Sequence, residues 1–204
     1  MRVDLRLLTA IAILGACGFA VAQGWDIVHF SVAMANDGSS EKRAKIINKW
    51  TAAPAIASTA LQTVLTEIDN SDVKAPNSRR ETLSLILSIK PLSPGDWLSL
   101  SGTQFATDQP INQVLGSLKL PMLAGPNEGY LMAERGIFGA SMWDKLSPDL
   151  KTRVAIDLIA ADISGRDKIR NALSEEPERV RKEIKEVLLA NGLSQKEIDQ
   201  QLGF

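Results

Sequence analysis

Two acids in the middle of the chain, Glu128 and Glu134, are the first candidates for chemistry. A pair of carboxylates is enough for acid–base hydrolysis of a glycosidic bond. Their six-residue spacing does not place them on one face of a helix. Because two acids are sufficient for this chemistry, a hydrolase or lyase that acts on cell-wall or surface glycan is one functional hypothesis. It requires two acids to meet in a cleft, with at least one carboxyl pKa raised.

Other kinds of active site have few residues to draw on. The chain has one histidine, His29, and one cysteine, Cys17, and both lie in an apolar N-terminal region. We therefore expect no histidine-based catalysis, no metal site and no cofactor, and a lone cysteine excludes an internal disulfide. The net charge is −1 and the body of the chain has no basic run, so nucleic acid is not an expected partner. These features favour a protein that is not an enzyme.

Binding of another protein is the leading hypothesis. Asn127, Glu128, Tyr130 and Arg135 combine polar reach with the only tyrosine of the chain, and we predict that they form a partner-binding surface. Arg135 also has a structural alternative, which is an ion pair with an acid of a neighbouring helix. A carrier of small molecules, with a pocket between helices, is a third hypothesis.

A single helix over Gly125–Leu146 is expected to position these residues. Gly129, Ala133, Gly136 and Ala140 recur at i, i+4, i+7 and i+11, so they share one face. Glycine inside a helix costs about 1 kcal/mol relative to alanine, so two glycines on this face suggest a packing reason. We predict that another helix crosses here with its backbone unusually close, inside a layered all-helical array.

The rest of the chain also predicts helices. Apolar residues recur at helical spacing, and alternating runs typical of strands are nearly absent, so the fold class is all-α. Ser93-Pro94 and Ser147-Pro148, each followed by an acid, predict helix starts. Ser194 with Glu197 predicts a capping box. Pro121 is expected to end a short helix that begins at Ile111.

A weak internal repeat suggests how the helices are arranged. Trp25-x-x-Val28 and Trp97-x-x-Leu100 are each followed by a small residue and a turn, then a short helix. This pattern resembles the first helix of a tetratricopeptide (TPR) unit. The resemblance implies antiparallel helix pairs stacked as a short TPR-like superhelix. An irregular helical bundle with the tryptophans in its core is the alternative.

The N-terminal segment predicts a link to the membrane. Arg2 and Arg6 precede Leu7–Ala22, which carries no charge. It is suited to an uncleaved membrane anchor, to a signal peptide cleaved after Ala20-Val21-Ala22, or to a lipoprotein signal with Cys17 as the lipidated residue. All three place the body of the protein outside the cytoplasm, and a buried N-terminal helix is the remaining alternative. We expect an inner-membrane protein with a periplasmic domain, or a periplasmic protein if the leader is cleaved.

Three parts of the chain follow from these patterns. Residues 1–22 form the anchor or signal peptide, and residues 23–163 form the helical-repeat-like domain. Residues 164–204 carry eight basic and eight acidic side chains and are expected to form charged helices packed on the same domain.

Two stretches carry a resemblance to a group of proteins. Residues 97–102 (WLSLSG) and residues 125–143 (GPNEGY followed by RG, FG and Trp143) resemble alphaproteobacterial cell-envelope proteins that have no assigned activity. The resemblance implies an envelope location and a non-enzymatic accessory role near surface-polysaccharide or secretion assembly. It implies an envelope protein as partner and assigns no functional residue.

Overall fold

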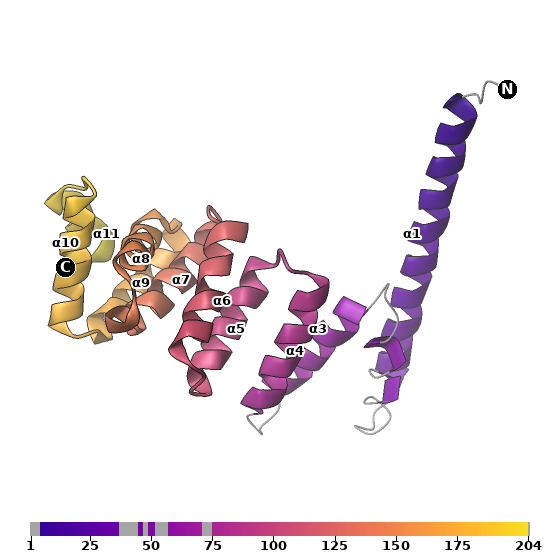
Figure 1. Ribbon diagram of the computed structural model, residues 1–204, viewed down its shortest axis with the longest axis horizontal. Helices are drawn as coiled ribbons and strands as arrows, with labels where there is room; N and C mark the ends of the chain where they lie inside the picture. The colour runs from indigo at the N-terminus through magenta and orange to yellow at the C-terminus, as the bar shows by residue number, and fades with distance from the viewer. Residues whose placement is uncertain (1–4, 37–44, 47–48, 52–56, 71–74, 204) are drawn as a thin grey trace. The chain divides into compact units, whose positions relative to one another are not determined.

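The computed structural model describes residues 5–36, 45–46, 49–51, 57–70 and 75–203. Within these residues the chain forms helices and no strand, which confirms the all-α prediction. The chain divides into two compact units, Met1–Lys90 and Pro91–Phe204. The elements of each unit are shown in Figure 1, and each unit is considered by itself.

The first unit consists of α1 (Leu5–Asn36), α3 (Ala57–Asp69) and α4 (Pro76–Ile89). The helices α3 and α4 pack against each other, since both have apolar faces at helical spacing. The end of α1 joins this unit through Phe30, which is 3% exposed and packs with Ala60, Ile46 and Trp50. The rings of Phe30 and Trp50 meet edge to face, with centroids 6.4 Å apart. Buried positions of α3 and α4 include Leu61, Leu65, Thr82, Leu83, Ile86 and Leu87.

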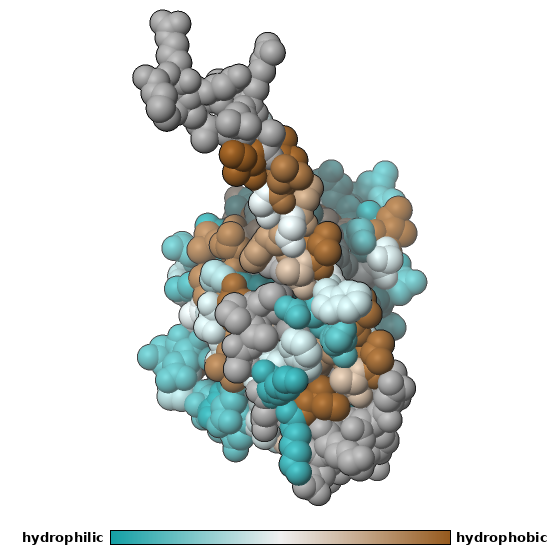
Figure 2. Space-filling view, turned by 90° about the vertical axis from the view of Figure 1, so that its right-hand side faces the viewer, coloured by the Kyte–Doolittle hydropathy of each residue, from teal (hydrophilic) through white to brown (hydrophobic). Residues whose placement is uncertain are grey.

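The N-terminal helix has the length and composition of a membrane span. Ile11–Ala33 is apolar enough to cross a bilayer, and its side chains are almost all exposed. This confirms the predicted hydrophobic N-terminal helix. Figure 2 shows its apolar side chains along the helix below the grey N-terminal atoms. The helix continues unbroken through Ala20-Val21-Ala22 to Asn36, well beyond the predicted limit of the leader.

The second unit is a layered array of short helices. The helices α5 and α6 form one pair, α7 packs on α8 and α9, and α10 and α11 complete the array against α8 and α9. The elements are α5 (Pro94–Ala106), α6 (Ile111–Ala124), α7 (Gly129–Ser141), the 3₁₀ helix η1 (Trp143–Lys145), α8 (Pro148–Ala160), α9 (Ile163–Glu175), α10 (Glu178–Ala190) and α11 (Gln195–Leu202).

The charged C-terminal residues belong to this second unit. The helices α9, α10 and α11 contact α7 and α8, so no structural division falls at residue 163. Their apolar faces enter the common core, which also holds the fully buried Trp143. The TPR-like stacking of the helix pairs stays a prediction. Apolar residues that join this core from the last three helices are Ile169, Leu173, Val180, Ile184, Leu188, Ile198 and Leu202.

Most predicted helix starts are correct. Proline opens α5 at Pro94 and α8 at Pro148, where its missing N–H costs nothing. The capping box at α11 is complete. The Ser194 hydroxyl accepts a hydrogen bond from the Glu197 N–H, and the Glu197 carboxylate accepts one from the Ser194 N–H. The prediction for Pro121 is wrong, because α6 passes through it and ends at Ala124. The carbonyl of Pro121 still accepts a bond from the Gly125 N–H at 3.0 Å.

The small-residue face of α7 lies where another helix approaches closely. A β-carbon on Gly136 would lie 2.8 Å from Leu158 Cδ2, and one on Gly139 would lie 2.4 Å from Val154 Cγ2. The predicted close crossing is therefore confirmed, with α8 as the crossing helix. The expected extent was too long, because α7 covers only Gly129–Ser141 and an extended Glu128 precedes it.

Candidate functional site

Arg135 of α7 is buried at the centre of the second unit, with 1% of its surface exposed. Its guanidinium binds both oxygens of Asp157 on α8, with Nε–Oδ2 at 2.8 Å and Nη2–Oδ1 at 2.9 Å. This is the bidentate geometry that gives an arginine–carboxylate pair its strength and direction. The expected ion pair between Arg135 and an acid of a neighbouring helix is thus confirmed.

The remaining N–H groups of Arg135 hold the turn between α6 and α7. Nη1 donates to the carbonyls of Pro121 at 3.1 Å and Gly125 at 2.7 Å, and Nη2 donates to that of Pro126 at 3.1 Å. A guanidinium has five N–H donors, and all five are used here. We call this arrangement of Arg135, Asp157 and the three carbonyls the Arg135 clamp.

The clamp corrects the prediction that Arg135 lies on a binding surface. A buried side chain with every donor occupied has nothing to offer a partner. Its effect on the surface is indirect, because it fixes the turn from which α7 and Tyr130 project. Burial raises the pKa of Asp157, against the opposing effects of the hydrogen bonds and charge of Arg135 and the charge of Arg153.

The other three predicted residues lie together on the surface. Asn127 and Glu128 are exposed, and Tyr130 is 61% exposed in the first turn of α7. Partial burial and the neighbouring Glu128 carboxylate raise the pKa of Tyr130. Their role in partner binding stays a prediction.

Tyr130 forms the edge of an open groove between α5 and α7, which we call the α5–α7 groove. It encloses about 460 Å³. The α7 wall carries Tyr130, Glu134 and Phe138 at i, i+4 and i+8, so these side chains share one helix face. The Phe138 ring packs edge to face on Phe105 of α5, with centroids 5.8 Å apart. The α5 wall is made by Gly95, Leu98, Ser99 and Gly102, and Leu131 completes the lining.

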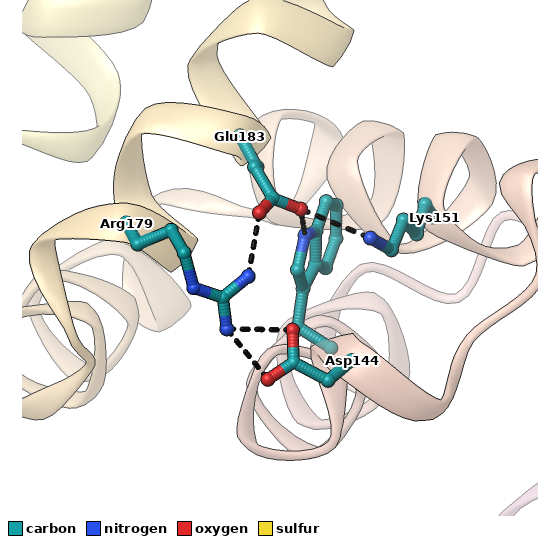
Figure 3. A network of polar contacts seen from close by, with 5 residues as sticks. Asp144, Lys151, Arg179 and Glu183 are labelled. Atoms are coloured by element: carbon teal, nitrogen blue, oxygen red, sulfur yellow. Dashed lines mark hydrogen bonds and ion pairs between the residues drawn. The ribbon is translucent and has the colours of Figure 1, made fainter.

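A second polar cluster joins η1, α8 and α10, and we call it the Glu183 network (Figure 3). Glu183 accepts bonds from the Trp143 indole at 2.9 Å, from Lys151 at 3.0 Å and from Arg179 at 2.6 Å. Arg179 also reaches both oxygens of Asp144, at 2.7 and 2.6 Å. Two acids are balanced by two bases, so the network links elements and leaves no excess charge for a ligand.

The carboxylates named as catalytic candidates do not meet. Glu134 pairs with Lys168 of α9, and Glu128 lies beside Tyr130. The buried acid is instead Asp157, whose oxygens are both taken by Arg135. Among the residues that the structure describes, no group of three or more His, Cys, Asp or Glu side chains is placed to hold a metal ion.

The histidine and cysteine both lie on α1. His29 is exposed and packs beside Trp25, with ring centroids 4.9 Å apart and the ring planes tilted by 43°. Cys17 is exposed on the apolar part of the same helix, and its lipidation stays a prediction.

Sequence reasoning missed the α5–α7 groove and the two acids that organise the second unit, Asp157 and Glu183. The groove had a signal in the sequence, since Gly95, Ser99 and Gly102 recur at i, i+4 and i+7. Asp157 had no local signal, because its partner Arg135 lies 22 positions away. The i,i+4 spacing of Arg179 and Glu183 indicated their ion pair, but not the bond from Trp143, which lies 40 positions from Glu183. Comparison of the chain with known protein families, curated proteins and solved structures found no match.

Proposed function

We propose that this protein is a non-enzymatic, membrane-anchored helical scaffold that binds another protein of the cell envelope. The observation that carries the proposal is the pairing of an exposed apolar N-terminal helix with a helical unit whose α5–α7 groove presents the Tyr130 and Phe138 rings. Aromatic side chains beside an apolar groove are typical of surfaces that bind proteins.

The length of α1 supports a membrane anchor. Leu7–Trp25 holds 19 residues without a charge. A helix of that length spans about 28 Å at 1.5 Å per residue, close to the roughly 30 Å of a bilayer core. Trp25 ends this segment, as expected for an aromatic side chain at the membrane surface. Five residues later, Phe30 is buried in the first unit. The anchor therefore leads directly into folded protein.

Exposed apolar residues beyond Ala22 favour retention of the helix over cleavage. Trp25 is 65% exposed, and Ile27, Val28 and Val32 are also exposed. Cleavage after Ala22 would leave all four in water, whereas an intact helix keeps them at or near the membrane surface. Arg2 and Arg6 on the N-terminal side favour a cytoplasmic N-terminus and a body on the far side, the periplasm in a cell with two membranes.

Two measurements on native membranes test the proposal. We expect the full-length protein to resist alkaline carbonate extraction with its N-terminal segment intact, and chemical crosslinking to recover a reproducible envelope protein with it. Release by carbonate together with a new N-terminus at Gln23 would contradict the anchor. Failure to recover any partner would contradict the scaffold.

A matched pair of variants links recovery to the groove. We expect Tyr130→Ala to lower recovery of the crosslinked partner at least tenfold, because the variant removes the exposed ring at the groove edge. Leu189→Ala is the control, since Leu189 is an exposed apolar residue of α10 in the same unit and does not line the groove. Equal recovery with both variants would show that the partner binds elsewhere.

A further inference from the structure

Leu98 is the one large side chain that the α5 wall of the groove carries. Gly95, Ser99 and Gly102 line it from one face of the helix. A β-carbon added to Gly95 or Gly102 would meet no atom within 4 Å. Another backbone can therefore approach this wall closely.

Other small helix faces of the second unit are filled by a neighbouring helix. Gly136 and Gly139 of α7 take the Leu158 and Val154 side chains of α8, and Gly165 of α9 takes Ala133 of α7. The wall of α5 has the same composition, but no described helix of the second unit lies against Gly95 or Gly102. Because the small faces of α7 and α9 are each covered by a helix, we infer that the small face of α5 is also suited to pack against a helix.

The charge of the opposite wall, on α7, indicates which kind of helix would bind in the groove. Glu134 lines the groove, and the Glu128 carboxylate lies beside Tyr130 at its edge. The nearby cation is Lys168, whose side chain is 58% exposed and pairs with Glu134. An exposed ion pair of this kind contributes little to stability, so a partner's cation can share or replace it. Two acids against one base leave a negative groove edge.

We propose that the α5–α7 groove binds an amphipathic helix of the partner protein. The helix would carry an apolar stripe that packs on Gly95, Ser99, Gly102 and Phe138, and a lysine or arginine that reaches Glu134 or Glu128. This is recognition of a helix in a groove, with anchors at i, i+3 or i+4 and i+7. The inference rests on the proposed partner-binding function and adds the chemistry of the bound segment.

Two variants block the groove while preserving the fold. Gly102→Leu fills the α5 wall, and no neighbouring atom opposes the new side chain near its β-carbon. The double variant Glu134→Lys with Lys168→Glu keeps an ion pair between α7 and α9 but reverses the charge of the groove wall. An unchanged or higher melting temperature of each variant establishes that the fold is intact.

The experiment uses a photocrosslinker at the groove edge of the full-length protein in native membranes. Tyr130→p-benzoylphenylalanine replaces one exposed aromatic ring with another, and the same substitution at Leu189 is the control position. Crosslinked peptides are identified by mass spectrometry. We expect the Tyr130 position to capture a helical segment with an apolar stripe and at least one lysine or arginine. Gly102→Leu and the charge-reversed double variant should each lower the yield at least tenfold.

Each other outcome overturns the inference. Crosslinks to a second copy of this chain, to an acidic segment or only to lipid would refute the stated partner chemistry. A partner captured only from the Leu189 position would refute the groove and leave the scaffold function standing. Absence of a protein crosslink from either position, with no partner recovered chemically, would overturn the proposed function as well.

Discussion

Arg135 uses all five of its N–H groups inside the protein, so its removal should be costly. We expect Arg135→Ala to lower the free energy of unfolding by about 3–5 kcal/mol, because Asp157 would stay buried without its partner. Arg135→Lys should recover only part of this loss, since an ammonium lacks the planar fork that meets two carboxylate oxygens. Urea unfolding of the full-length protein in detergent measures both.

The control for the clamp is Lys119→Ala on α6, where the side chain is exposed. Its effect should be within about 0.5 kcal/mol, as for most surface substitutions. If Arg135→Ala lowered the free energy of unfolding by less than about 1 kcal/mol, the clamp would contribute no more than an ordinary surface ion pair.

Glu183 should make stability depend on pH in a defined window. Its pKa is lowered from the ordinary 4.5 to about 2, because Lys151, Trp143 and Arg179 donate hydrogen bonds to the carboxylate. A carboxyl whose pKa is lower in the folded chain stabilises the fold above the unfolded value and loses that contribution as the pH falls toward the folded value. The contribution of Glu183 is therefore present at pH 7 and declines from about 4.5 to about 2.

The corresponding variant is Glu183→Gln. Its melting temperature should lie below that of the wild type at pH 7, and the difference should narrow steadily below pH 4.5. Glu186→Gln is the control on the same helix, since Glu186 makes only an exposed contact of 3.9 Å with Lys182. A Glu183→Gln difference that stays constant down to pH 3 would show that the carboxylate charge does not stabilise the network.

Substitution by alanine should change the free energy of unfolding in opposite directions at two helix glycines, Gly139 and Gly102. Gly139→Ala places a methyl group 2.4 Å from Val154 Cγ2, so α7 and α8 must move apart, and we expect a loss of about 1–3 kcal/mol. Gly102→Ala meets open space within α5, and we expect a gain of about 0.5–1 kcal/mol from helix propensity. Thermal unfolding compares the two. Similar effects of both substitutions would refute the close packing of α7 on α8.

The helices show where sequence reasoning succeeds and where it stops. Local signals predicted the starts of α5 and α8 and the close crossing at α7, because caps, prolines and glycine spacing act within a few residues. They gave the wrong end for α6, since the chain accommodates Pro121 inside the helix. The length of α7 was also overestimated, because the Arg135 clamp shapes the turn before it through carbonyls that no side-chain pattern records.

At the level of the whole chain, sequence predicted an apolar N-terminal helix and an all-α body. It predicted the surface positions of Asn127, Glu128 and Tyr130 and misplaced Arg135, because polarity alone does not separate an exposed arginine from one that a distant acid neutralises. The groove went unnoticed for a similar reason. The spacing of Gly95, Ser99 and Gly102 indicates a small face on α5, but the packing of α5 with α7 is needed to show that this face lines a groove.

The proposed membrane anchor is tested by placing a single charge in α1. Leu14 is 71% exposed and lies near the middle of the uncharged Leu7–Trp25 segment. An arginine at the centre of a membrane helix costs about 2.5–3.5 kcal/mol during insertion. We therefore expect Leu14→Arg to move much of the protein into the carbonate-soluble fraction. Leu85→Arg, at an exposed apolar position of α4, should leave membrane retention unchanged.

A second pair of variants, Leu14→Arg and Tyr130→Ala, separates the proposed anchor from the groove. If α1 only tethers the protein, Leu14→Arg should abolish co-sedimentation with membranes but leave the α5–α7 groove able to bind its partner in detergent solution. Tyr130→Ala should have the reverse effect, retaining the protein in membranes without the partner. Loss of both properties in either variant would show that the membrane helix and the binding unit depend on each other, as an extended interface that includes the bilayer surface would require.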